Sequence, residues 1–154
     1  VNPVLKKEGI QLLSQGMSGG KHKMIEQFKK YADHSALFGT DSFWEGVDVR
    51  GEALSGVIID KLPFAPPDDP VLAARLRVYE ERGENGFVAY QVPQAVISLK
   101  QGAGRLIRSE TDKGVLMICD SRLITKPYGK RIWQSLPSFA RTRHESVVTE
   151  FFAG

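Results

Sequence analysis

The sequence is poor in the residues that form disulfides, metal sites and membrane spans. It contains one cysteine, Cys119, so no disulfide and no cysteine-based metal or iron-sulfur site can form within the chain. The three histidines, His22, His34 and His144, are scattered without the spacing of metal ligands. No signal peptide is visible in these residues, and no apolar run in them is long enough to cross a bilayer. We therefore expect a cytoplasmic protein without a metal site in this chain.

The overall composition is that of an ordinary globular domain. With 154 residues, 42% hydrophobic and 25% charged, the chain is long enough to bury a substantial core, and we expect residues 1–154 to form a single domain. A net charge of +3 and a pI near 9.0 are compatible with a polyanionic partner without requiring one.

Hydrophobic patterning predicts short strands that alternate with helices. Asp69 and Pro70 form a typical helix start, with Asp69 as the cap and Pro70 as the first residue. Met24, Phe28 and Tyr31 are expected to face the core from one helix. The expected strands are 11–13, 36–38, 54–62 and 115–119, and those at 36–38 and 54–62 are expected to be buried. The expected helices are 23–31, 70–82, a central helix through 101–108, and 128–135. This alternation implies an α/β fold, a three-layer α/β/α sandwich with a mostly parallel sheet.

The stretch QGAGRLIR, residues 101–108, is the most informative part of the chain. If it is helical, Gln101, Arg105 and Arg108 share one face. The apolar residues lie about half a turn away and form the core face: Val92, Val96, Leu99, Ala103 and Leu106. Arginine forks match the geometry of phosphate oxygens, so this row of donors suits a phosphate ligand. A solvated arginine face is the alternative, and it is the commoner one for a lone basic helix.

Two glycines in the same stretch support a ligand. Gly102 and Gly104 each cost about 1 kcal/mol of helix stability relative to alanine, which indicates that something approaches the backbone closely.

A second glycine-rich stretch, GMSGGKHK, superficially resembles a phosphate-binding loop. The glycines before Lys21 do not have the spacing of GxxxxGK[ST], and His22 replaces the hydroxyl residue that would hold magnesium. We reject that interpretation and expect a polar turn before a helix.

The segment GTDSFWEGVD follows the expected strand 36–38. Ligands bind at the carboxyl ends of strands in parallel α/β sheets, so polar residues here are well placed. Glu45 and Asp48 can accept hydrogen bonds from a ribose or orient an arginine, although each alone is more often a turn residue. Phe43 and Trp44 fit the core better than a base-stacking role.

Taken together, the ordered motifs resemble the C-terminal RecA-like motor lobe of DinG/YoaA-type, XPD-like superfamily 2 DNA helicases. The resemblance rests on GTDSFWEGVD as motif V, on KLPFAPPDDP, and on QGAGRLIRSETDKG as motif VI. It continues through DSR at 120–122, TKPYG at 125–129 and SLP at 135–137, and so covers nearly all of residues 38–137.

The resemblance implies roles for individual residues. Arg108 and Arg105 would reach the ATP triphosphate as arginine fingers, and Gln101 would position the γ-phosphate region. The other residues implied at the nucleotide are Gly104, Glu45, Asp48 and Gly46. Thr40 and Ser42 occupy the place where motif V contacts the DNA backbone.

The resemblance also implies partners outside these residues. ATP would lie between this lobe and an N-terminal helicase lobe that carries the phosphate loop, the Mg²⁺ ligands and, where the family has one, an iron-sulfur cluster. The expected substrate is single-stranded or forked DNA, unwound 5′ to 3′ in repair or replication. Because the chain lacks a phosphate loop, we expect it to be a piece of a larger protein and inactive in ATP hydrolysis by itself.

Two other functions fit the same residues. One is a non-catalytic module that binds single-stranded nucleic acid or a protein partner through the basic surface. The other is a stand-alone nucleotide-binding enzyme, and the absence of a general base beside the arginines makes it the weakest.

Overall fold

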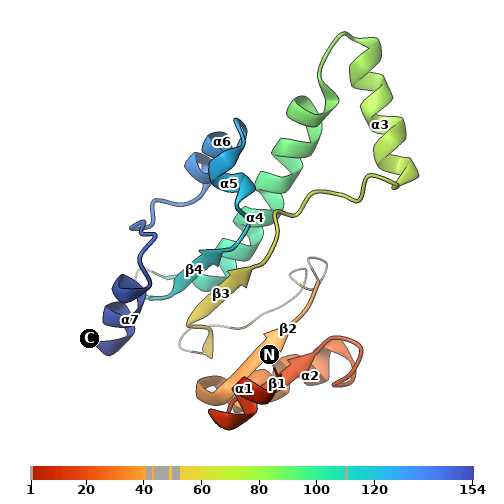
Figure 1. Cartoon of the computed structure of the whole chain (residues 1–154). Coiled ribbons are helices and arrows are strands. Elements are labelled where there is room, and N and C mark those ends of the chain that lie inside the picture. Colours follow the sequence, from red (N-terminus) through yellow and green to blue (C-terminus); the bar gives the residue numbers. More distant parts are fainter. Residues whose placement is uncertain (1, 41–42, 44–48, 50–52, 110) are drawn as a thin grey trace. The chain divides into compact units, whose positions relative to one another are not determined.

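The computed structural model describes residues 2–40, 43, 49, 53–109 and 111–154 (Figure 1). The chain divides into two compact units, one made of Val1–Val57 and Gln101–Leu116, the other of Ile58–Lys100 and Met117–Gly154. The elements before the first break are α1 (Asn2–Lys7), β1 (Gln11–Ser14), α2 (Lys21–Lys30), the short 3-10 helix η1 (Ala32–His34) and β2 (Ser35–Phe38). Those that follow are β3 (Gly56–Ile59), α3 (Pro70–Glu81), the π-helical turn η4 (Phe87–Gln91), α4 (Val92–Leu106), β4 (Val115–Ile118), α5 (Arg122–Thr125), α6 (Gly129–Ser135) and α7 (Glu145–Ala153).

The strands pair in parallel, as the sequence predicts. β1 pairs with β2 in a register that runs from Gln11 opposite Ser35 to Ser14 opposite Phe38. β3 pairs with β4, and its backbone bonds, from Val115 N–H to Ser55 O and from Cys119 N–H to Ile59 O, advance together along both strands, as in a parallel pair. The α/β class is therefore confirmed, and within the described residues the strands form two pairs.

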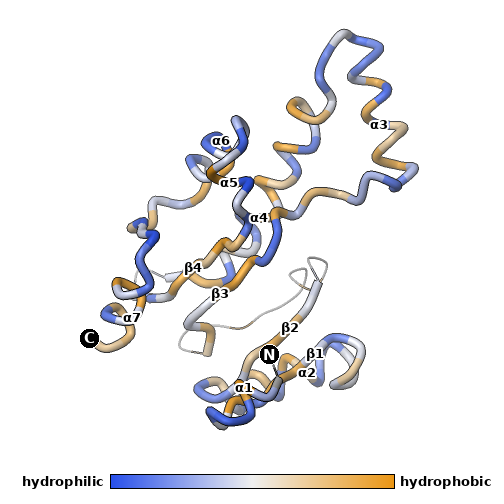
Figure 2. The backbone as a smooth tube through the Cα atoms, in the orientation of Figure 1, coloured by the Kyte–Doolittle hydropathy of each residue, from blue (hydrophilic) through white to orange (hydrophobic). Residues whose placement is uncertain are grey.

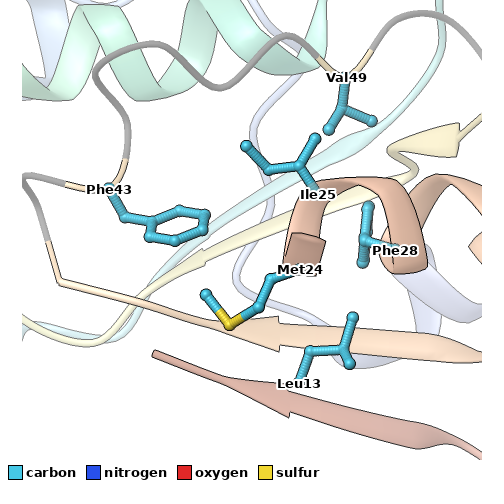
Figure 3. Packing of buried hydrophobic residues seen from close by; sticks show 6 residues of the cluster. All are labelled: Leu13, Met24, Ile25, Phe28, Phe43 and Val49. Atoms are coloured by element: carbon cyan, nitrogen blue, oxygen red, sulfur yellow. The ribbon is translucent and has the colours of Figure 1, made fainter. Parts of the chain in front are cut away.

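The core of the first unit lies between α2 and the β1–β2 pair. Its buried members are Leu13, Met24, Ile25, Phe28, Phe43 and Val49 (Figure 3). The predicted core roles of Met24 and Phe28 are confirmed, and Phe43 fills the core as expected. Trp44 lies outside the described residues.

The prediction that Tyr31 faces this core is wrong. Its side chain is 46% exposed. α2 ends at Lys30, and the non-helical backbone of Tyr31 (φ −119°, ψ 38°) removes its side chain from the buried stripe. The ammonium of Lys30 lies 5.2 Å from the centre of the Tyr31 ring instead.

Local signals set the bounds of α3, as predicted. The Asp69 carboxylate accepts hydrogen bonds from the backbone N–H groups of Val71 (2.8 Å) and Leu72 (3.2 Å), and Pro70 is the first helical residue. Such a cap is worth about 1 kcal/mol. The helix ends before Gly83, whose φ of +74° suits glycine.

The strand predicted at 54–62 is shorter and less buried than expected. Only Gly56–Ile59 is strand, and Ile58 is 70% exposed while Val57 and Ile59 are buried. Successive strand residues face opposite sides, so the continuous hydrophobic colouring of β3 in Figure 2 covers one buried and one exposed face. Phe38, expected in a buried strand, is likewise 47% exposed.

The sequence patterns predict no helix after Pro137, where the structure has the C-terminal helix α7. Among the described residues, no helix has the length and apolar character needed to span a membrane.

Candidate nucleotide-binding surface

The amphipathic character predicted for α4 is confirmed. Leu99, Ala103 and Leu106 are at most 3% exposed, whereas Gln101 is exposed and Arg105 is half-buried. The amide and the guanidinium therefore lie off the core face of the helix, where a ligand can meet them.

The prediction that Arg108 continues this helical face is wrong. α4 ends at Leu106, and Arg108 is an exposed residue beyond its end. The Oδ2 atom of Asp112 accepts hydrogen bonds from the backbone N–H groups of Arg108 and Ser109, both at 2.9 Å. A further α-helical turn would direct the Arg108 N–H to the carbonyl of Gly104, so the Asp112 bond replaces a helical bond.

We call this arrangement of Arg108, Ser109 and Asp112 the Asp112 turn. The Ser109 hydroxyl donates to Oδ1 of Asp112 at 2.7 Å, so both carboxylate oxygens accept hydrogen bonds. These bonds, the one from the Ser109 side chain first, lower the pKa of Asp112 below its ordinary value. The turn fixes the backbone from which the Arg108 side chain extends.

Gly104 lies on the exposed side of α4. A Cβ placed there meets no side chain or neighbouring chain segment within 4 Å. Packing inside the described residues therefore gives no reason for glycine at this position. A closely approaching ligand remains the predicted reason. Gly102, by contrast, is buried.

Thr40, the residue predicted to contact DNA, is exposed just beyond the carboxyl end of β2. Oε1 of Gln15 accepts hydrogen bonds from both its backbone N–H (3.0 Å) and its hydroxyl (3.1 Å). The sequence patterns did not single out Gln15. The signal was its place directly after strand β1, because the carboxyl ends of parallel neighbours meet at one edge. Ser42, Glu45, Gly46 and Asp48 lie outside the described residues, so their roles stay predictions.

The DSR motif forms a polar network in the second unit. The side chain of Asp120 is only 6% exposed and accepts from Nη2 of Arg122 at 2.6 Å and from Nε at 3.0 Å. The backbone N–H of Leu62 also donates to it, at 2.8 Å. The Arg122 bonds, together with that from Leu62, hold the pKa of Asp120 far below its usual range, and Asp120 raises the pKa of Arg122.

Aromatic packing extends this network. The Arg122 guanidinium lies 5.4 Å from the centre of the Phe64 ring, and Phe64, Phe87 and Tyr128 contact one another with ring centres 5.1 to 5.6 Å apart. The DSR, KLPF and PYG motifs therefore meet in one place, where they stabilise the second unit.

Carboxylates and histidines do not gather into a metal site anywhere in the described part of the chain. The exposed donors of 101–108 carry positive charge or amide groups and suit an anion.

Comparison with known proteins identifies the family to which the chain is similar. Residues 1–139 match the family model described as the helicase C-terminal domain. The chain is 52% identical over 146 residues to an ATP-dependent DNA helicase YoaA of Haemophilus influenzae, and the match covers 95% of this chain and 22% of that protein. It is 51% identical over 144 residues to the YoaA helicase of Escherichia coli, covering 94% and 22%. An ATP-dependent helicase DinG of Mycobacterium tuberculosis is 47% identical over 125 residues, covering 81% and 19%. The chain thus spans about a fifth of the length of these relatives.

Proposed function

The chain belongs to the helicase C-terminal domain family, in its DinG/YoaA branch, and from this we propose that it is the second motor lobe of an ATP-dependent DNA helicase. One observation carries the proposal: Gln101 and Arg105 lie outside the core face of α4, and the exposed Arg108 follows on the Asp112 turn. In the family this stretch is motif VI.

The donor set suits the triphosphate of ATP. Guanidinium groups bind phosphate oxygens in pairs and keep their charge at every physiological pH. We propose that Arg108 and Arg105 act as arginine fingers, with Gln101 beside the γ-phosphate. Gly104 would allow close approach, and Glu45, Gly46 and Asp48 would complete the nucleotide site. Hydrolysis of the bound nucleotide supplies the energy for unwinding.

The backbone of Arg108 is well suited to this role. Two carboxylate bonds within the Asp112 turn hold the residues from which the guanidinium extends. A finger whose main chain is already fixed loses less conformational freedom when it reaches a phosphate.

The same residues do not fit a cation. Guanidinium groups cannot ligate Mg²⁺, so the proposal places the Mg²⁺ ligands, and an iron-sulfur cluster where one exists, in the N-terminal helicase lobe.

DNA is the proposed polymer substrate. We propose that Thr40 and Ser42 lie at the backbone of a single strand, and contacts of this kind carry no base information, as a translocating enzyme requires. Movement from 5′ to 3′, a role in repair or replication and a cytoplasmic location belong to the same proposal.

The test is Arg108→Ala in the full-length protein. We expect ATP hydrolysis stimulated by single-stranded DNA to fall by roughly three to five powers of ten, as for other arginine fingers. Binding of single-stranded DNA should be retained. Arg77→Ala, which removes an exposed arginine of α3, is the matched control and should leave turnover unchanged.

Undiminished turnover of Arg108→Ala would refute the finger role. A full-length protein with no ATP hydrolysis at all, but with tight binding to single strands, would favour the non-catalytic binding module instead.

A further inference from the structure

Gln15 is the first residue after β1 and is held at three points. Its backbone N–H donates to the carbonyl of Phe38 at 3.0 Å, which extends the β1–β2 ladder by one bond. Its side-chain Oε1 accepts from the N–H and the hydroxyl of Thr40 at 3.0 and 3.1 Å. Residues from the ends of two parallel strands are thus joined at the edge where ligands bind in α/β folds.

The Thr40 bonds determine which way the carboxamide of Gln15 is turned. A backbone N–H can only donate, so the atom that faces it must be the oxygen. The amino group of the carboxamide, Nε2, with its two N–H donors, therefore lies on the side of Gln15 that does not face Thr40.

The same bonds limit what Thr40 can offer a ligand. Its hydroxyl hydrogen is donated to Gln15, and a hydroxyl has no second hydrogen to donate to a ligand. Phosphate oxygens only accept hydrogen bonds. At this edge Nε2 of Gln15 is consequently a better donor to a phosphate than the Thr40 hydroxyl.

Both residues are exposed, so a ligand can reach them. A free glutamine side chain loses rotamer freedom when it binds, whereas this one is already ordered by its bonds to Thr40.

We propose that Gln15 donates a hydrogen bond from Nε2 to a phosphate oxygen of single-stranded DNA and that Thr40 holds the carboxamide in place for it. The inference rests on the proposed function, because it requires the domain to bind DNA. A neutral donor releases no counterion, so Gln15 adds affinity without adding salt dependence or base preference.

The decisive variant is Gln15→Glu in the full-length protein. The carboxylate still accepts both bonds from Thr40, but an anionic oxygen replaces the amino group and repels phosphate. We expect the Kd for a fluorescent oligothymidylate, measured without nucleotide at fixed salt, to rise by about tenfold or more. Gln11→Glu makes the same charge change at the exposed other end of β1, and its Kd should stay within about twofold.

Two more variants separate the loss of the donor from other effects. Gln15→Ala removes the donor without adding charge, and we expect about fivefold weaker binding with an unchanged salt slope. Thr40→Val keeps the backbone N–H that holds Gln15, so it should weaken binding less than Gln15→Glu. Thermal melting of each variant checks the fold. If Gln15→Glu has a lower Tm than wild type, the binding affinity of Gln15→Ala decides the test.

Binding of a fluorescent ADP analogue without DNA distinguishes the two sources of phosphate. A loss confined to the DNA measurement supports the proposal, and a loss confined to the nucleotide measurement overturns it. Wild-type DNA affinity in both Gln15 variants, or a larger loss in Thr40→Val, would also overturn it while leaving the motor-lobe function intact. A wild-type protein that binds no single strand would instead contradict the proposed function itself.

Discussion

Replacing Asp120 by asparagine is expected to destabilise the second unit. The side chain is 6% exposed and accepts hydrogen bonds from the Arg122 side chain and from the backbone N–H groups of Leu62 and Arg122. Asparagine keeps one acceptor oxygen but loses the charge and one acceptor, which leaves the guanidinium without its anionic partner.

The size of the effect follows from the exposure of the two partners. Breaking a fully buried ion pair costs about 3 to 5 kcal/mol. The Arg122 side chain is 40% exposed, so water solvates part of the guanidinium, and we reduce the expected cost to about 2 kcal/mol. For a domain of this size that corresponds to a decrease in Tm of about 4 to 8 °C.

The difference in Tm between wild type and Asp120→Asn should decrease as the pH falls. The pKa of Asp120 is lowered in the folded state, so the folded protein binds fewer protons than the unfolded chain at acid pH. The stabilisation is therefore complete above the ordinary carboxyl pKa of about 3.9 and decreases as the pH falls below it. The gap in Tm between wild type and Asp120→Asn should shrink from pH 7 to pH 3.

The assay is thermal unfolding followed by circular dichroism at both pH values, with Asp68→Asn as a control for an exposed carboxylate. A Tm for Asp120→Asn within 1 °C of wild type at pH 7, or a gap that widens in acid, would refute the reasoning; the 1 °C limit is well below the roughly 4 °C expected.

Three further predictions concern residues in and shortly after 101–108. Gly104→Ala should raise stability by up to about 1 kcal/mol, since alanine favours helix and a Cβ meets open space, yet it should weaken ATP binding if a nucleotide approaches the backbone there. In Gly114→Ala, by contrast, the added Cβ overlaps the Leu106 side chain and lies 3.0 Å from the carbonyl oxygen of Ser55. The free energy of unfolding should therefore decrease by about 1 to 3 kcal/mol. Asp112→Ala releases the Asp112 turn and should reduce DNA-stimulated ATP hydrolysis by up to about a hundredfold through misplacement of Arg108. The melting temperature of Asp112→Ala should change little, and a rate of ATP hydrolysis equal to wild type would contradict the positioning role of Asp112.

Local signals in the sequence were enough to predict some elements closely. The bounds of α3 follow from Asp69, Pro70 and Gly83, all of which act within one helical turn of the ends. The core face of α4 was equally predictable, because its period is a property of the helix itself.

Other features depend on partners that the local pattern does not reveal. α4 ends before Arg108 because Asp112, four residues later, takes over the backbone N–H group. The contact of Gln15 with Thr40 joins residues 25 apart and requires the register of β1 against β2. The hydrophobic period of α4 does not show where the helix ends, because Asp112, which binds the backbone after its last turn, lies outside that period.

The bond between Asp120 and Leu62 also has a consequence for chain length. The two residues are 58 positions apart, so their contact closes a long loop that contains α3, η4, α4 and β4. The entropy of loop closure grows slowly, by only about 0.6 kcal/mol for each doubling of a flexible loop. We therefore expect a few residues inserted in the flexible connection between α3 and η4 to destabilise the domain only slightly, provided that the Asp120 carboxylate and the Leu62 amide, whose bond joins the two ends, are retained.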